Sequence, residues 1–296
     1  MINRAVLLTS IGLHSLLFSQ HYTETVHPKW HQKFAISQVL YQEKTPYQDL
    51  ILFENDTFGT VLALDGAIQV TEKDEFIYQE MLTQVPIFAH GAVESVLVIG
   101  GGDGGILREV LKHPEIKRVV LVEIDKKVID FSKIYLPFLS QGAFEDPRVE
   151  IIIQDGCEYV NQAQETFDVI ICDSTDPVGE GANLFTPEFY ADCHSCLNEG
   201  GIFVNQSGVP FLQGSEIAHV NRALKQSFQN VNFYFVAVPT YVGGVMALGF
   251  ASDAHHKPSL AKLKERYSPY EETLRYYTPE VHKGAFATPK YIADAL

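Results

Sequence analysis

The rhythm of hydrophobic and polar positions changes near residue 95 of the chain. From there on, short apolar runs of strand length alternate with segments whose apolar residues recur at helical spacing. The predicted strands cover residues 95–100, 119–125, 149–155, 167–173 and 201–207, and the predicted helices cover residues 104–113, 126–136, 156–162 and 186–197. Near-continuous apolar strands separated by helices indicate a mostly parallel sheet with helices on both faces, a Rossmann-like α/β fold. Two later runs, residues 231–241 and 245–253, are predicted to add an antiparallel edge.

The segment before residue 95 has a different pattern, that of short antiparallel strands. Partial alternation of apolar and polar residues in 33–44 and 47–55 predicts strands, and Asp65-Gly66 is a strong signal for a two-residue hairpin. Residues 72–90 then show helical spacing with Pro86 inside the run. The chain is therefore expected to consist of an N-terminal extension (1–21), a small antiparallel β domain (22–77) and a Rossmann-like domain (78–296).

The first twenty residues need a separate interpretation. Arg4 followed by the apolar stretch 5–18 resembles the core of a short signal sequence, but the stretch is too short to span a membrane. Since no clear small-x-small cleavage site follows, we interpret it as an extension and expect a cytoplasmic protein. The four cysteines, Cys157, Cys172, Cys193 and Cys196, are expected to be reduced thiols without redox or metal chemistry.

Composition narrows the range of partners. Hydrophobic residues make up 46% and charged residues 20% of the 296 residues, which is typical of a globular protein. The formal net charge of −15 disfavours nucleic acid and anionic membranes as partners and is compatible with a cationic ligand. No metal site is expected.

Acidic residues follow four successive predicted strands. Asp103 lies in the glycine turn "GGGDGG" after the first strand, Glu123 ends the second, and Asp155 and Asp173 follow the third and fourth. Ligands of open α/β sheets bind at the carboxyl edge of the strands, where all four would meet. Each acid alone could simply cap a helix. Because like charges at one edge repel each other, we expect a ligand that compensates the whole set.

Asp103 discriminates between the ligands that such a turn can hold. Gly100, Gly102 and Gly105 fit the spacing of a nucleotide-binding turn, and an acid at the position of Glu123 can accept both ribose hydroxyls of an adenosine. A pyrophosphate would be repelled by Asp103, whereas an ammonium group would form a charge-assisted hydrogen bond with it. The turn therefore favours a sulfonium nucleoside, and decarboxylated S-adenosylmethionine above the intact form.

Asp173 and Asp176, in the stretch "DVIICDSTDP", form a second acidic pair. Two carboxylates this close, at the same edge of the sheet, would suit a substrate with two separated ammonium groups. An Asx turn with a capping aspartate is the structural alternative. The "VGEGANLF" segment that follows is typical of a loop that folds over a site.

From about residue 22 to its end, the chain resembles the polyamine aminopropyltransferases. The resemblance rests on long segments in matching order: "YQDLILFEN", "LALDGAIQVTEKDEFIYQEM", "VLVIGGGDGGILREVLKH", "VEID", "QDG", "FDVIICDSTDP", "LFTPEFY" and "PTYVGG". It implies transfer of the aminopropyl group of decarboxylated S-adenosylmethionine to putrescine, giving spermidine and S-methyl-5'-thioadenosine. It also implies a homodimer or homotetramer, and a co-substrate in place of a permanently bound cofactor.

The resemblance assigns roles to individual residues. Asp173 would accept the proton of the attacking amine, assisted by Tyr78. The residues that would hold the nucleoside are Gln48, Asp103, Glu123, Asp155 and Gly156. Those that would contact the diamine are Tyr22, Gln79, Asp173, Asp176 and Tyr241.

Three positions depart from common members of the family, and all lie on the acceptor side. Gln79 stands where many bacterial relatives have histidine, Tyr22 where relatives usually have tryptophan, and Glu180 where some have proline. The acceptor therefore stays open between putrescine and cadaverine, agmatine or spermidine. Three further classes were weighed: an NAD-dependent dehydrogenase, which fails on Asp103, a methyltransferase using intact S-adenosylmethionine, and a non-enzymatic polyamine sensor.

Overall fold

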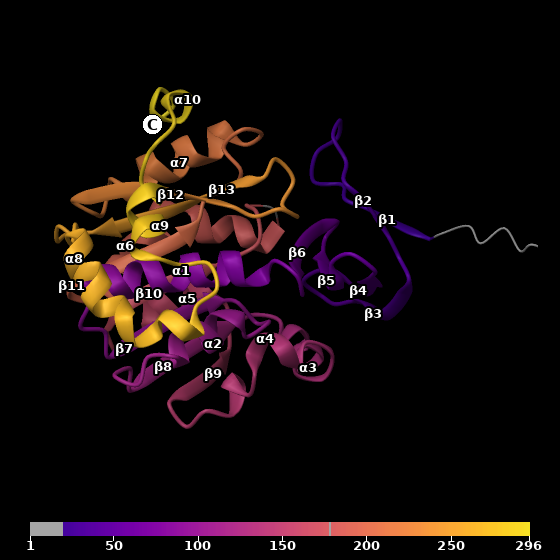
Figure 1. The fold of residues 1–296 in the computed structure, drawn as a ribbon, viewed down its shortest axis with the longest axis horizontal. Coiled ribbons are helices and arrows are strands. Elements are labelled where there is room, and N and C mark those ends of the chain that lie inside the picture. The colour runs from indigo at the N-terminus through magenta and orange to yellow at the C-terminus, as the bar shows by residue number, and fades with distance from the viewer. Residues whose placement is uncertain (1–19, 178) are drawn as a thin grey trace, which may run out of the picture.

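The computed structural model describes residues 20–177 and 179–296. Most of the predicted N-terminal extension, residues 1–19, and the side chain of Glu180 lie outside the described part of the chain. Figure 1 shows two small sheets at one end of the molecule and a large sheet flanked by helices at the other. The predicted order, a small antiparallel β unit followed by a mostly parallel α/β unit, is confirmed.

The N-terminal part consists of two antiparallel sheets. Strand β1 (His21–Thr23) pairs with β2 (Lys33–Ala35), and a four-stranded meander follows: β3 (Gln38–Lys44), β4 (Asp49–Asn55), β5 (Gly59–Leu64) and β6 (Ala67–Thr71). Asp65 and Gly66 join β5 to β6 with φ of 47° and 86°. Positive φ at both central residues defines a type I′ turn, whose twist matches that of the strands it joins. The predicted hairpin is confirmed.

Helix α1 (Glu75–His90) connects the small sheets to the large one and contains Pro86, as predicted. It is buried along nearly its whole length. It ends at Gly91, whose left-handed conformation (φ 77°) lets its N–H bond the carbonyl of Ile87. The start of α1 therefore carries Tyr78 and Gln79 to the junction between the two parts of the molecule.

The large sheet has the strand order β12-β13-β11-β10-β7-β8-β9. Its strands are β7 (Ser95–Gly100), β8 (Arg118–Glu123), β9 (Val149–Ile153), β10 (Phe167–Asp173), β11 (Leu197–Gln206), β12 (Asn230–Ala237) and β13 (Val245–Ser252). Strands β7 to β11 run parallel, and β12 and β13 form the predicted antiparallel edge. Alternate residues of each strand enter different cores, as with Val96 and Val98 on one face and Leu97 and Ile99 on the other.

Helices cover both faces of this sheet. They are α2 (Gly105–Leu111), α3 (Lys126–Tyr135), α4 (Pro137–Ser140), η1 (Ala143–Glu145), α5 (Gly156–Gln162), η2 (Gly179–Phe185), α6 (Pro187–Ser195), α7 (Gly214–Leu224), α8 (Leu260–Tyr267), η3 (Ser268–Thr273), α9 (Pro279–Ala285) and α10 (Lys290–Ala293). All four cysteines are free thiols, as predicted, and Cys172, Cys193 and Cys196 are buried in the core beneath α5 and α6. Across the described ranges, no helix has the length and apolarity that crossing a membrane requires.

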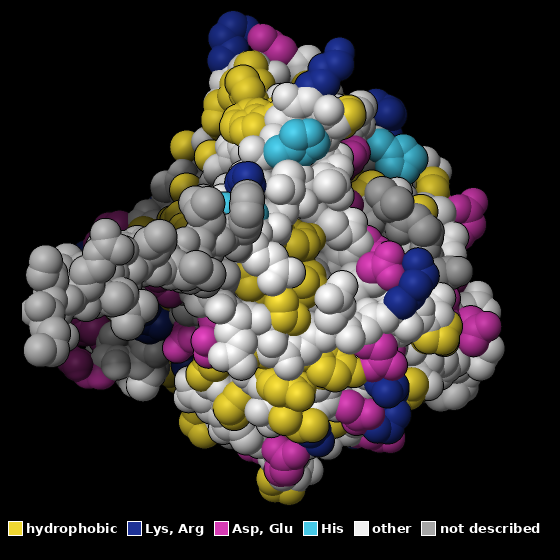
Figure 2. Space-filling model, turned by 90° about the vertical axis from the view of Figure 1, so that its right-hand side faces the viewer, with side chains coloured by type: hydrophobic (Ala, Val, Ile, Leu, Met, Phe, Trp, Pro, Cys, Tyr) yellow, Lys and Arg dark blue, Asp and Glu magenta, His cyan; other side chains and the backbone are white. Residues whose placement is uncertain are grey.

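The order of strands reverses at the pair β7 and β10. The chain passes from β7 outward to β8 and β9 in one direction, and from β10 to β11 in the other. Gly100 at the end of β7 lies beside Asp173 at the end of β10. In open α/β sheets the crevice outside this switch point is where ligands bind. Figure 2 views the end of the molecule that carries the small sheets, where Trp30 and Tyr47 expose 45% of their surface.

Candidate active site

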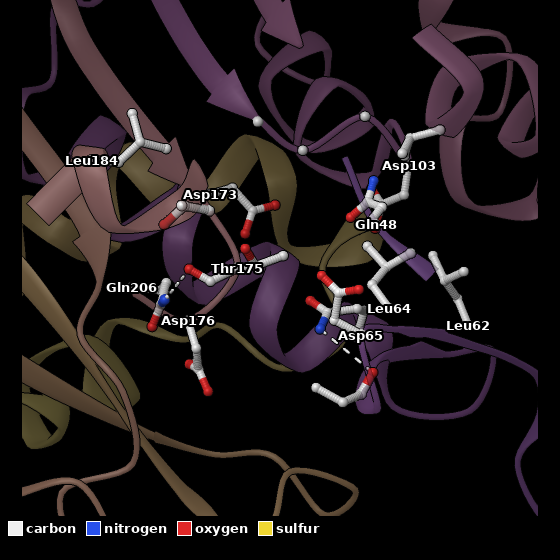
Figure 3. Close-up of a pocket in the computed structure, with 18 of the residues that line it drawn as sticks. Gln48, Leu62, Leu64, Asp65, Asp103, Asp173, Thr175, Asp176, Leu184 and Gln206 are labelled. Atoms are coloured by element: carbon white, nitrogen blue, oxygen red, sulfur yellow. Dashed lines mark hydrogen bonds between the residues drawn. The ribbon is translucent and has the colours of Figure 1, made fainter. Parts of the chain in front are cut away.

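A cavity of about 260 Å³ opens at the switch point, between the large sheet and the small β domain. Figure 3 shows Asp103, Asp173 and Asp176 around it, together with Leu62 and Leu64 of β5. Seven acidic residues line the cavity: Glu24, Asp65, Asp103, Glu123, Asp155, Asp173 and Asp176. No lysine, arginine or histidine occurs among the described residues that line it. The cavity is therefore suited to a cationic ligand.

The glycine turn after β7 brings the backbone close to two of these acids. Gly100 has a φ of 78°, and a Cβ on it would lie 2.1 Å from the carbonyl oxygen of Asp173. A Cβ on Gly102 would lie 2.7 Å from Oε2 of Glu123. Both positions consequently require glycine, and the turn packs directly on the ends of β8 and β10.

Asp103 is held in place by the turn itself and by helix α1. Its Oδ1 accepts a hydrogen bond from the N–H of Gly105 (2.7 Å), and its Oδ2 accepts one from Nε2 of Gln79 (3.3 Å). Burial raises the pKa of Asp103 to about 6, against the opposing effect of the Gly105 hydrogen bond. Oε1 of Gln79 is buried and has no hydrogen-bond partner within the described part of the chain. A donor group of a ligand can satisfy both side chains at this point.

The predicted nucleoside residues lie together on the β8 side of the cavity. Glu123 is 7% exposed, its Oε1 accepts from the N–H of Asp125 (2.9 Å), and burial raises its pKa to about 7. Asp155 caps helix α5 through the N–H groups of Cys157 (2.6 Å) and Glu158 (3.3 Å). The capping alternative is therefore correct for Asp155, which nevertheless lines the cavity with Gly156.

Gln48 approaches the same region from the small β domain. Its Nε2 donates to Oδ2 of Asp125 (3.1 Å), which also accepts from the hydroxyl of Thr45 (2.8 Å). Asp125 is the N-cap of α3 and accepts the N–H of Lys127. This shared carboxylate ties the small domain to the end of β8, so that Gln48 and Glu123 line one cavity.

Asp173 and Tyr78 form a direct contact at the centre of the site. The hydroxyl of Tyr78 donates to Oδ1 of Asp173 over 2.8 Å. Burial raises the pKa of Asp173 to about 7, with further contributions from the negative charges of Asp103 and Glu123, while the bond from Tyr78 opposes the rise. The ring of Tyr241 packs edge-on against Tyr78, with 5.6 Å between centroids.

Asp176 lies at the other end of the cavity, in the loop after β10. Its Oδ2 accepts from Nε2 of Gln213 (3.1 Å), and burial raises its pKa. Nε2 of Gln206 donates to the carbonyl of Thr175 (3.0 Å), which ties this loop to the end of β11 (Figure 3). The hydroxyl of Tyr241 donates to the carbonyl of Gln69 (2.8 Å).

Ten of the eleven predicted site residues line the cavity, and Tyr22 does not. The expectation that Tyr22 lines the diamine end is therefore not met in this structure. Its ring packs on Phe53, with 5.3 Å between centroids, in a small core shared with Phe34. Apolar burial of the ring on this core draws it away from the acids. Glu24, two residues further on, lines the cavity from the same segment.

Sequence reasoning missed Glu24, Asp65, Gln206 and Gln213, which also line the cavity. Gln206 ends a predicted strand, like the four acids, and its polar side chain was a usable signal. Gln213 and Glu24 are brought in from loops by long-range packing, and nothing local marks them. No cluster of three or more potential metal ligands occurs in residues 20–177 and 179–296.

Comparisons with known proteins agree with this geometry. The family model described as spermine/spermidine synthase domain matches residues 75–261, and the spermidine synthase tetramerisation domain matches residues 18–72. The polyamine aminopropyltransferases of Pectobacterium carotovorum and Klebsiella pneumoniae are each 50% identical over 275 residues, covering 92% of this chain and 96% of theirs.

Two solved structures are similar over the same length. A spermidine synthase in complex with the transition-state analogue AdoDATO superposes with a TM-score of 0.89 at 39% identity. The spermidine synthase from Thermotoga maritima superposes with a TM-score of 0.86 at 37% identity, and each comparison covers 94% of both chains. By fold, site and sequence, this chain belongs to the spermine/spermidine synthase family of polyamine aminopropyltransferases.

Proposed function

We propose that this protein is a spermidine synthase, which transfers the aminopropyl group of decarboxylated S-adenosylmethionine to putrescine. The products are spermidine and S-methyl-5'-thioadenosine. The observation that carries the proposal is the cavity at the switch point, with seven acidic residues and no basic residue among its described lining. Both substrates are cations, and both would gain charge-assisted hydrogen bonds there. Family membership supports the same transferase chemistry.

For the donor, we assign the ribose to Glu123, the adenine to the region of Asp155 and Gly156, and the aminopropyl ammonium to Asp103. Gln48 closes this half of the site. The contact between Asp103 and Gln79 supports the assignment, because the unpaired Oε1 of Gln79 can accept a second hydrogen bond from the same ammonium group. An intact S-adenosylmethionine would bring its carboxylate against Asp103, which explains the preference for the decarboxylated form.

For the acceptor, we assign the attacking nitrogen to Asp173 and the far ammonium group to Asp176 and Tyr241. The nitrogen lone pair attacks the carbon next to the sulfonium, the C–S bond breaks, and its electron pair stays on sulfur as a neutral thioether. The proton released from nitrogen passes to Asp173 or to water. Because the leaving group is neutral, alignment of the two reactants is the main task of the enzyme.

The raised pKa of Asp173 narrows the gap that proton transfer must overcome. A free alkylamine has a pKa of about 10.4, against about 3.9 for an ordinary aspartate. With Asp173 at about 7, the difference falls to roughly three units. The nearby sulfonium lowers the pKa of the amine further. Tyr78, which donates to Asp173, would orient the carboxylate toward the nitrogen.

Two broader properties follow from the same assignment. The N-terminal sheets match the tetramerisation domain, so the protein is an oligomer, and we propose a homodimer or homotetramer formed through this domain. We also propose a cytoplasmic location, supported by the four free cysteines, since disulfides are rare in that compartment.

The proposal is tested by mixing the purified protein with decarboxylated S-adenosylmethionine and one amine at a time. Mass spectrometry then measures spermidine and S-methyl-5'-thioadenosine. Efficient turnover of putrescine is expected, with cadaverine, agmatine and spermidine as slower acceptors. Absence of aminopropyl transfer to every amine would refute the assignment. Turnover of cadaverine, agmatine or spermidine in place of putrescine would keep the chemistry and change the acceptor.

A further inference from the structure

One carboxylate near the acceptor end of the cavity has no role in the proposed function. Glu216 lies in the first turn of α7 and does not itself line the cavity. Its Oε2 is buried and has no hydrogen-bond partner among residues 20–177 and 179–296. Burial raises the pKa of Glu216 to about 7, and the negative charge of Asp176 adds to the rise. Ionised Glu216 therefore lacks compensation in the free protein.

The position of Glu216 depends on a glycine in the loop after β11. Gly208 has a φ of 74°, and a Cβ on it would lie 2.9 Å from Oε2 of Glu216 and 3.0 Å from Oε1 of Gln213. The missing side chain leaves room for both groups. Oε1 of Gln213 accepts from the N–H of Val209 (2.6 Å), and both Gln213 and Val209 line the cavity. Glu216 therefore lies one layer behind the cavity wall.

Glu216 is part of a group of three acids at this end, with Asp176 and Glu24. Glu24 is 3% exposed and accepts from the N–H of Ile68 (3.0 Å) and from Nε2 of Gln32 (3.1 Å), and the charge of Asp176 raises its pKa. None of the three forms an ion pair with a lysine or arginine in the described residues. His27 is the neighbour whose charge lowers the pKa of Asp176.

We propose that Glu216 is a specificity-determining residue for the acceptor, because its charge behind Asp176 favours an amine with a second positive group. Glu216 acts through space, while Asp176 makes the contact with the ammonium. The inference rests on the proposed function, in which a diamine enters this end of the cavity. An amine of equal length without the second charge gains nothing from Glu216.

The test compares two amines of equal length, putrescine and 1-aminobutane, on wild type and Glu216→Gln. The KM for putrescine and kcat are measured at saturating decarboxylated donor, and 1-aminobutane is measured as an inhibitor competing with putrescine. In Glu216→Gln, the KM for putrescine should rise on the order of ten-fold, which corresponds to about 1.4 kcal/mol. The kcat and the inhibition constant of 1-aminobutane should stay within about two-fold.

Two further variants separate charge from structure. Glu216→Asp keeps the negative charge and should recover most of the wild-type KM for putrescine. Glu199→Gln makes the same charge change at the exposed, opposite end of β11, about 23 Å from Gln206 at 3.3 Å per residue, and should leave both constants unchanged.

Three results decide the matter. A rise of the putrescine KM in Glu216→Gln without a change for 1-aminobutane supports the inference. An equal loss for both amines would mean that Glu216 only supports the loop, and an unchanged KM for putrescine would mean that its charge is not felt; either overturns the inference. Absence of wild-type turnover with any amine would instead refute the proposed function, and the inference with it.

Discussion

Replacing Asp173 by asparagine should stabilise the ligand-free protein while it removes catalysis. In the folded protein the pKa of Asp173 is raised from 3.8 to about 7, chiefly by burial and then by the charges of Asp103 and Glu123. A carboxyl group with a raised pKa in the folded state is no burden below pH 3.8. As the pH rises through 7, the folded protein loses stability relative to the unfolded chain.

The size of the effect follows from the shift. At 1.36 kcal/mol per pKa unit, ionised Asp173 costs the folded protein about 4 kcal/mol at pH 8, of which about 3 kcal/mol arises between pH 5 and pH 8. Asparagine cannot ionise, and its side-chain oxygen can still accept the hydrogen bond from Tyr78. For a chain of this length, about 4 kcal/mol corresponds to a rise in Tm of about 6 °C.

Calorimetry of wild type and Asp173→Asn at pH 5 and pH 8, without ligands, measures this difference. The variant should melt at a higher temperature at pH 8, and the advantage should shrink markedly at pH 5. Its turnover should fall by orders of magnitude while binding of S-methyl-5'-thioadenosine is retained. A variant no more stable than wild type at pH 8, or equally stabilised at both pH values, would refute the reasoning.

Three other substitutions test neighbouring parts of the site. Asp103→Asn should raise the KM for the decarboxylated donor on the order of ten-fold or more and weaken discrimination against intact S-adenosylmethionine, and unchanged donor selectivity would remove Asp103 from the donor site. Tyr78→Phe deletes the hydrogen bond that lowers the pKa of Asp173, so the acidic limb of the kcat profile should move to higher pH; a shift to lower pH would contradict the assignment. Gly102→Ala brings a Cβ to 2.7 Å from Glu123 Oε2 and should weaken S-methyl-5'-thioadenosine binding in a calorimetric titration, whereas wild-type affinity would show that the turn tolerates the methyl group.

The features that the sequence predicted well are those with local causes. The Asp65-Gly66 turn follows from the positive φ that both residues tolerate, and the strands of the large sheet follow from apolar runs of strand length. The meeting of Asp103, Glu123 and Asp173 at one edge follows from parallel strand direction alone. Nothing beyond periodicity and chain direction was needed for these expectations.

The remaining parts of the site depend on contacts between distant segments. Gln213 reaches Asp176 across 37 positions of sequence, and Glu24 reaches the N–H of Ile68 across 44, so no local pattern marks either residue. Tyr22 was expected at the diamine end, but its ring is taken up by Phe53 in the small core of the β domain. Competition between an apolar core and a polar cavity for one aromatic side chain is decided by packing, which a single sequence does not display.

The most direct test of the account is donor selectivity at saturating putrescine. The kcat/KM of the wild-type protein is measured for decarboxylated and for intact S-adenosylmethionine, with products identified by mass spectrometry. A cavity lined by acids, with Asp103 in the glycine turn, predicts aminopropyl transfer from the decarboxylated donor and no group transfer from the intact one. Comparable turnover of intact S-adenosylmethionine, or methyl transfer from it, would contradict the claim that this cavity selects its ligands by positive charge.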